Sequence, residues 1–431
     1  MFLFLSGRVA VLGCLALLVL PLAAGASRAA GGEPLTAGTR IDAGALADLE
    51  DREFHGTRLA DLVTDRIAWQ MRTFGLTLEL ADPKPYPDDP RFEEATAKFA
   101  KDVRFDPATG RIDGWKAGLP FPEVDAINDP NAAIKIVWNL THGRNGGDIV
   151  HNPGEVILLI DRQAGLERLQ HWTFTNFKMK GILRFPETPV LGDGDILAKT
   201  LFFAMSPQDI KGVGTFTIKY DTGRLNDSWA YVRDVRRIRR LSGSTWMDRI
   251  SGTDWLNDDF SGFGAYPTWY EDFEILGRTE VLLVANSRMP TQILDASSEN
   301  ERFPRFDLAS APHWNVIDDW EPRDVYIVKA TPPDAHPYGY KILYIGADGF
   351  HPFLTEMYDK AGNHMKTQIL GQTLRETVDD VTRWAVHEAY DMTADFQSGH
   401  ATAFASAPEV QINPPMAEED VSLSVLETMG R

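Results

Sequence analysis

The feature that most constrains the fold of this chain is a long series of short apolar segments separated by turn residues. The segments are rich in β-branched and aromatic residues, as β-strands are. The strands that we expect cover residues 134–140, 156–160, 169–178, 213–220, 228–235, 281–284, 325–329, 341–345, 353–358 and 365–369. This series predicts a mainly β protein.

Two connections indicate the direction of these strands. Asp348-Gly349 lies between two of them, and residues 359–363 supply a longer loop that contains a glycine. Loops of this kind join antiparallel neighbours, whereas parallel strands need a crossover of a dozen or more residues. We therefore expect an antiparallel meander. Residues 384–390 fit a strand or a helix equally well.

Helical spacing is found near the N-terminus. Apolar residues recur at helical intervals over residues 59–74 and 92–103, and the proline-rich stretch 81–90 separates the two. The simplest interpretation is that both helices pack on the core and have no direct functional role. The fold class is thus α+β, with helices first and a large sheet after them.

The first 26 residues have the three-part pattern of a cleaved secretory signal, with Arg8, an apolar run over 9–22 and small residues at 24–26. The run is shorter than the ~20 residues that a spanning helix needs. Cys14, the single cysteine, lies inside this pattern, so we expect an exported, soluble chain without disulfides.

The formal net charge of −19 argues against nucleic acid as a partner, because proteins that bind nucleic acid usually carry a basic surface. The four arginines of the stretch 236–240 are therefore a local feature of an acidic body. We expect them to contact an anionic headgroup or an acidic partner. The four are Arg236, Arg237, Arg239 and Arg240.

No catalytic residue, metal site or cofactor is predicted. His387-Glu388 lacks the second histidine of a zinc-protease helix, and no serine stands in a G-x-S-x-G turn. One enzyme class stays open. A carbohydrate-active enzyme with an acidic, Trp-rich cleft is an alternative, because carboxylates stand beside Trp255, Trp269 and Tyr270. These carboxylates are Asp254, Asp258, Asp259, Glu271 and Asp272.

Large apolar side chains share one parity of three expected strands. A curved antiparallel sheet can leave a cavity lined by such residues, or a helix can cover them as ordinary core. If the cavity exists, these residues are its candidate ligand-binding wall: Trp172, Phe174, Phe216, Ile218, Trp229 and Tyr231.

The run 218–286 resembles an exported bacterial family, domain of unknown function 1329. It contains Trp229-Ala230-Tyr231, the stretch RRIRR at 236–240, a loop with Trp and Asp, and a return segment from 272 to 280. Residues 324–363 also look like the hairpin pair of that family. The similarity covers most of residues 115–400.

The resemblance implies the half-open antiparallel barrel of periplasmic lipoprotein carriers. It also implies association with an inner-membrane exporter of the resistance-nodulation-division type and an outer-membrane protein, and it brings no known catalytic residues. We therefore expect a large curved antiparallel sheet or half-open β-barrel wrapped over N-terminal helices. The expected parts are a signal (1–26), a helical and irregular region (27–114), the half-barrel (115–403) and an extended arm (404–431).

The leading hypothesis is a periplasmic carrier of a hydrophobic or amphiphilic, lipid-like molecule, and an adaptor of a membrane exporter is a third alternative. If the strand through the arginines is regular, Arg237 and Arg239 face opposite to Arg236 and Arg240. One pair would then lie at the rim or mouth of the cavity. Alternatively, the arginines pair with carboxylates such as those in the segment 248–259.

Overall fold

The computed structural model describes residues 32–143, 146–242, 246–250, 252–288, 292–293, 302–303, 306–379 and 383–430. The expected signal and Cys14 lie outside these residues. No helix in the described part is long and apolar enough to cross a membrane.

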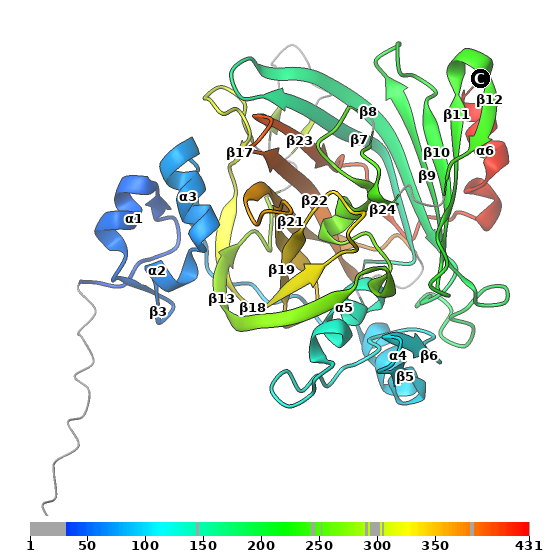
Figure 1. Ribbon diagram of the computed structural model, residues 1–431, viewed down its shortest axis with the longest axis horizontal. Coiled ribbons are helices and arrows are strands. Elements are labelled where there is room, and N and C mark those ends of the chain that lie inside the picture. The colour runs from blue at the N-terminus through cyan, green and yellow to red at the C-terminus, as the bar shows by residue number, and fades with distance from the viewer. Residues whose placement is uncertain are drawn as a thin grey trace, which may run out of the picture.

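A single sheet of 16 strands dominates the structure (Figure 1). It is almost entirely antiparallel and does not close, which confirms the predicted fold class. Along its main path the order is β1-β4-β18-β19-β20-β21-β22-β23-β7-β8-β9-β10-β11-β12, while β13 pairs with β18 and β24 with β7. One end of the sheet is therefore β12, and at the other end two edges lie beyond β18, namely β13 and the short pair β4-β1.

The long strands span the following residues: β7 Ile149–Asp161, β8 Gly165–Lys178, β9 Ile196–Ser206, β10 Gly214–Tyr220, β11 Asp227–Val232, β12 Arg237–Arg240, β13 Asp272–Leu283, β18 Asp319–Thr331, β19 Tyr340–Gly346, β20 Pro352–Tyr358, β21 His364–Glu376, β22 Trp384–Asp395 and β23 His400–Ala405. The short ones are β1 Arg40–Ile41, β4 Leu78–Leu80 and β24 Gln411–Ile412, and small two-stranded ribbons join β2 Glu53–Phe54 to β3 Thr57–Arg58, β5 Arg104–Asp106 to β6 Arg111–Asp113, β14 Gln292–Ile293 to β15 Arg302–Phe303, and β16 Phe306–Asp307 to β17 Asn315–Val316.

The helices are α1 Ala43–Leu49, α2 Leu59–Leu62, α3 Asp65–Phe74, α4 Pro90–Phe99, α5 Ala132–His142 and α6 Leu423–Gly430. The helix expected over 59–74 is divided, because Thr64 leaves the helical conformation and its side chain caps the backbone of Ile67 at 3.2 Å. Asp89 caps α4 in the same way, and Pro90 occupies its first turn.

The strand expected at residues 134–140 is wrong, because this segment forms α5. Its apolar residues alternate, which suggested a strand, yet Ala133, Ile136, Val137 and Leu140 also satisfy helical spacing. The helix is buried on nearly every side, so tertiary packing overrides the strand propensity of its β-branched residues.

Two of the long strands were not predicted from the sequence, and neither were the short ones. β9 and β23 were not expected, and the ambiguous residues 384–390 belong to β22. The two expected hairpin loops are confirmed, since residues 347–350 join β19 to β20 and residues 359–363 join β20 to β21.

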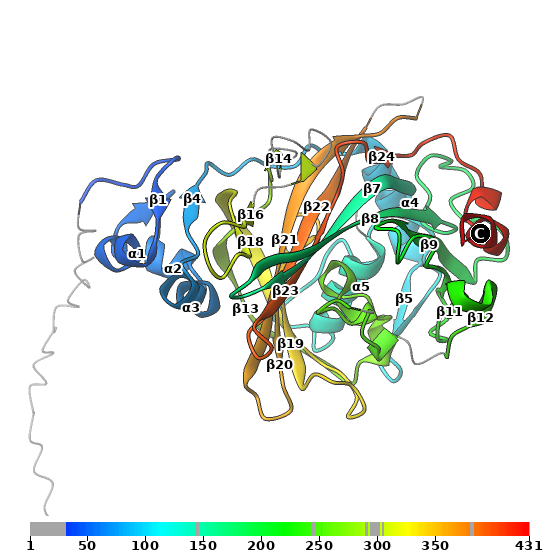
Figure 2. The ribbon, with the colours of Figure 1, turned by 90° about the horizontal axis from the view of Figure 1, so that it is seen from above.

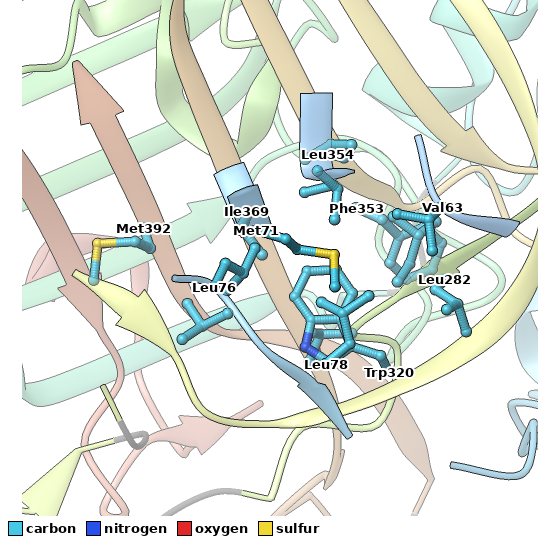
Figure 3. Packing of buried hydrophobic residues seen from close by; sticks show 14 of the residues in the cluster. Val63, Met71, Leu76, Leu78, Leu282, Trp320, Phe353, Leu354, Ile369 and Met392 are labelled. Atoms are coloured by element: carbon cyan, nitrogen blue, oxygen red, sulfur yellow. The ribbon is translucent and has the colours of Figure 1, made fainter. Parts of the chain in front are cut away.

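The sheet carries different elements on its two faces. Helices α1–α3 pack on the outer face of β13 and β18–β23, and α6 packs on the outer face of β9–β11 at the opposite end. Helix α5 lies inside the curve of the sheet, as Figure 2 shows. Figure 3 shows part of the larger outer cluster, in which Met71, Leu78 and Trp320 lie together.

We predict that Leu426→Ala lowers the free energy of unfolding by about 2–4 kcal/mol. Leu426 on α6 is fully buried against the outer face of β9–β11, so truncation leaves a cavity there. Leu276→Ala is the control, because that side chain is 49% exposed, and it should change stability by less than about 0.5 kcal/mol. Urea unfolding measures both. Equal losses in the two variants would contradict the packing of α6.

Candidate functional site

The connection between the two edge strands, β12 and β13, passes through the concavity of the sheet (Figure 1). We call residues 246–250 and 252–270 the interior segment. Its turn over residues 257–262 packs against β20 and β21. Gly262 has φ 78°, and a Cβ there would lie 2.9 Å from Thr355 Oγ1, so the close approach to the sheet requires glycine.

Two adjacent carboxylates of the interior segment meet a lysine of the sheet. Lys341 Nζ lies 2.9 Å from both Asp258 Oδ2 and Asp259 Oδ1, and all three side chains are fully buried. Tyr270 donates a hydrogen bond to Asp258, and Tyr338 donates one to Asp259. Burial would raise the pKa of the Asp258 carboxyl, but Lys341, His336 and Tyr270 together outweigh it and hold this pKa below its usual value.

A second lysine anchors an earlier part of the segment. Lys366 Nζ, which is also buried, donates to the backbone carbonyl of Asp254. The Asp254 carboxylate accepts hydrogen bonds from His400 Nδ1 at 2.6 Å and Thr402 Oγ1 at 2.8 Å. The bond to Asp254 raises the pKa of His400. The interior segment is thus fixed to the sheet through buried charges.

These contacts bear on the carbohydrate-enzyme alternative. The acid and base of a glycosidase must both reach the sugar. Asp254, Asp258 and Asp259 are at most 3% exposed and are engaged by the sheet. These three therefore line no open cleft, whereas Glu271 and Asp272 are exposed at the start of β13.

Beside the interior segment, the concave face retains a cavity of about 240 Å³. Its walls come from β8, β9, β10, β22, α5 and the interior segment. The aromatic lining consists of Trp115, Phe174, Phe260, Phe263, Tyr266 and Trp269. Polar lining residues include Asn176, Lys178, Lys180, Lys219 and Glu388.

One carboxylate next to the cavity contacts two of the lining residues, His142 and Lys180. Asp221 lies 2.5 Å from His142 Nε2 and accepts from Lys180 Nζ at 2.6 Å. Burial would raise the pKa of this carboxyl, but His142 and Lys180 lower it overall. Lys219 Nζ lies over the ring of Phe260, 5.3 Å from its centroid. A cationic group of the wall therefore contacts an aromatic ring of the interior segment.

Two carboxyls lie on the β7–β22 side. Burial, together with the charge of Glu388, raises the pKa of Glu155 to about 8, while Asn152 opposes the shift through a hydrogen bond. Burial likewise lowers the pKa of His387 to about 3, and its Nε2 lies 2.8 Å from Ser406 Oγ. His387 is therefore neutral at physiological pH.

The six residues proposed for the cavity wall lie on two faces. Phe174 lines the cavity, and Trp172 stacks on Phe202 beside it on the same concave face. The other four pack under α6 on the outer face, and they are Phe216, Ile218, Trp229 and Tyr231. Cross-strand partners share a face, and Phe216 pairs with Leu201, whereas Phe174 pairs with Phe202. The prediction that all six residues line one cavity wall therefore has to be corrected.

The arginine stretch forms the free edge strand β12. Arg236 has φ 48° in the turn before the strand, so the regular alternation begins only at Arg237. Arg237 and Arg239 share one face, and Arg240 lies on the other with Trp229. Arg240 forms an ion pair with Asp227, not with the segment 248–259. In the described part of the chain, no carboxylate pairs with the other three arginines.

The sequence analysis missed the lysines of the site. Lys178, Lys180 and Lys219 are scattered, and none stands in a motif, so only the pairing of β8, β9 and β10 brings them to one wall. The one available signal was their position: Lys178 and Lys219 interrupt apolar strand segments.

Comparison with known proteins identifies a family. The family described as "Protein of unknown function (DUF1329)" matches residues 55–422, which confirms the resemblance found in residues 218–286. No curated protein matches the sequence.

Several solved structures are similar in part. A putative outer membrane lipoprotein-sorting protein domain from Vibrio parahaemolyticus has 16% identity and a TM-score of 0.45, covering 68% of this chain and 97% of its own. A DUF1329 family protein from Desulfovibrio piger has 15% identity and a TM-score of 0.44, covering 68% and 95%. A LolA superfamily protein from Nitrosomonas europaea has 12% identity and a TM-score of 0.40, covering 68% and 98%.

We predict that Lys341→Met lowers the free energy of unfolding by about 3–5 kcal/mol, because it leaves two buried carboxylates without a cation. Urea unfolding at neutral pH measures the loss. The matched control is the triple variant that adds Asp258→Asn and Asp259→Asn, which removes the unpaired charges and should recover part of the stability. A single variant within about 1 kcal/mol of the wild type would show that the pair does not fix the segment.

A second prediction concerns Glu155, whose carboxyl has a pKa of about 8 in the folded protein and an ordinary pKa near 4.5 in the unfolded chain. A carboxyl whose pKa is raised by folding stabilises the folded state below its unfolded pKa, and this contribution is lost as the pH rises through the folded value. Between about pH 5 and about pH 8, Glu155→Gln should therefore lose less unfolding free energy than the wild type. Glu123→Gln, at an exposed position, is the control. Parallel curves for Glu155→Gln and the wild type would refute the assignment.

Proposed function

This chain belongs to the DUF1329 family, and we propose that it is a periplasmic binding protein that carries an amphiphilic, lipid-like molecule. The observation that supports this proposal is the cavity on the concave face, whose wall combines aromatic rings with lysines. The secretory-signal pattern of the first 26 residues supports the periplasmic location.

The chemistry of the wall suits a molecule with an apolar part and an acidic group. Each buried methylene contributes about 0.8 kcal/mol, so the rings of Phe174, Phe260 and Trp269 would bind a short apolar segment. Lys178 and Lys219 stand on the same wall and offer ammonium groups to a carboxylate or phosphate.

The volume limits how much of a ligand is enclosed. About 240 Å³ is below the roughly 300–1,000 Å³ of common small-molecule sites. The cavity would enclose an acidic group with a few methylenes, and a longer chain would extend out of it.

An acyl chain would not replace the interior segment. If the interior segment moved out, Lys341 would lose Asp258 and Asp259. Lys366 would lose the carbonyl of Asp254, and both lysines would then face hydrocarbon, which is unfavourable. The ligand therefore lies beside the segment. The family resemblance suggests that such a carrier works with an exporter of the resistance-nodulation-division type and an outer-membrane protein.

We predict that protein purified gently from the periplasm carries an acidic amphiphile, detected by mass spectrometry of an organic extract and absent from a denatured and washed sample. Phe174→Asp and Lys219→Glu should each reduce the bound amount at least about tenfold, since each places a negative charge in the cavity wall. Lys101→Glu, at an exposed position on the protein, is the control and should retain the ligand. An extract without ligand, or full retention by both cavity variants, would count against the carrier.

A further inference from the structure

One end of the sheet differs in charge from the rest of the protein. At this end residues 207–213 connect β9 to β10, and residues 233–236 connect β11 to β12. We call residues 205–213 and 233–240 the arginine tip. Its two turns are joined, because Arg233 donates hydrogen bonds to the backbone carbonyls of Gln208 and Asp209.

The arginine tip is basic, whereas the chain has a net charge of −19. Two acids stand among its residues, Asp209 and Asp234. Its basic residues are Lys211, Arg233, Arg236, Arg237, Arg239 and Arg240. Asp209 is itself engaged by Arg168 and Arg240 by Asp227, which leaves Arg236, Arg237 and Arg239 exposed and, within the described residues, without a carboxylate partner.

The arginine tip also exposes apolar side chains. Met205 is 37% exposed, Val213 37% and Val235 46%. Helix α6 ends against the same turns, since a Cβ on Gly212 would lie 3.1 Å from the carbonyl oxygen of Gly430, and Met429 there is 39% exposed. Figure 1 shows the C-terminal end of the described chain beside β11 and β12.

We propose that the arginine tip docks the protein on an anionic membrane surface. Guanidinium groups bind phosphate in a bidentate geometry, and apolar side chains between them can enter the interfacial region of a bilayer. A long acidic peptide added as a strand is the less suitable partner, because β12 offers only four residues for pairing. This docking does not depend on the proposed cargo.

The acidic body does not prevent this docking. At physiological ionic strength, charges separated by more than about 8 Å are largely screened. The local basic residues therefore determine the attraction at contact, while the acidic body disfavours other orientations. Charged side chains also protect an exposed sheet edge from pairing with other chains. That role alone predicts no affinity for membranes.

The test is co-sedimentation of the periplasmic protein with vesicles of phosphatidylglycerol and phosphatidylcholine, compared with vesicles of phosphatidylcholine alone. We expect binding to the anionic vesicles that weakens as salt increases. Arg237→Glu/Arg239→Glu should weaken it at least about tenfold, since each basic residue near a charged surface contributes measurably. Val235→Asp should weaken it as well.

The matched control is Arg72→Glu/Arg104→Glu, which makes the same change in net charge at exposed positions outside the arginine tip. It should keep the binding of the wild type. Circular dichroism establishes that all variants are folded. Three results would overturn the proposal: no binding to anionic vesicles at low salt, unchanged binding by the arginine-tip variant, or equal losses in both double variants.

Discussion

The ion pairs between Lys341 and the adjacent carboxylates of Asp258 and Asp259 are the contacts on which the interior of this protein depends. An open sheet of 16 strands has a concave face that must be filled. Here the filling is the connection between the two edge strands, so one segment both links the edges and occupies the concavity. Because lysines project from the sheet at this place, the segment has to be acidic.

This choice of filling determines where a ligand can lie. The interior segment covers the part of the concave face formed by β19–β23 and is bound there through buried charged groups. What is left lies between α5, the interior segment and strands β8–β10, and this is where the cavity is found. The position of the interior segment therefore explains two features. It buries the acidic residues that suggested a sugar cleft, and it leaves beside it the cavity that suggests a carrier.

The sequence predicted most of the sheet but only part of the site. Alternation and turn residues identified the antiparallel hairpins, while α5 was missed because its apolar residues satisfy both periods. The alternation of side chains along a strand predicts which residues share a face with Phe174 or with Phe216. It does not predict which face is concave, because strand pairing and the position of α6 decide that. The contact of Asp258 with Lys341 joins residues too far apart in the chain for local patterns to indicate.

The two proposed surfaces occupy opposite ends of one strand. Val213, just before β10, belongs to the arginine tip, and Lys219, near the end of β10, lines the cavity. At about 3.3 Å per residue the two are about 20 Å apart. A protein docked by its arginine tip would hold the cavity away from the headgroups, facing the aqueous space. Such an arrangement suits exchange of cargo with a second protein rather than direct uptake from the bilayer.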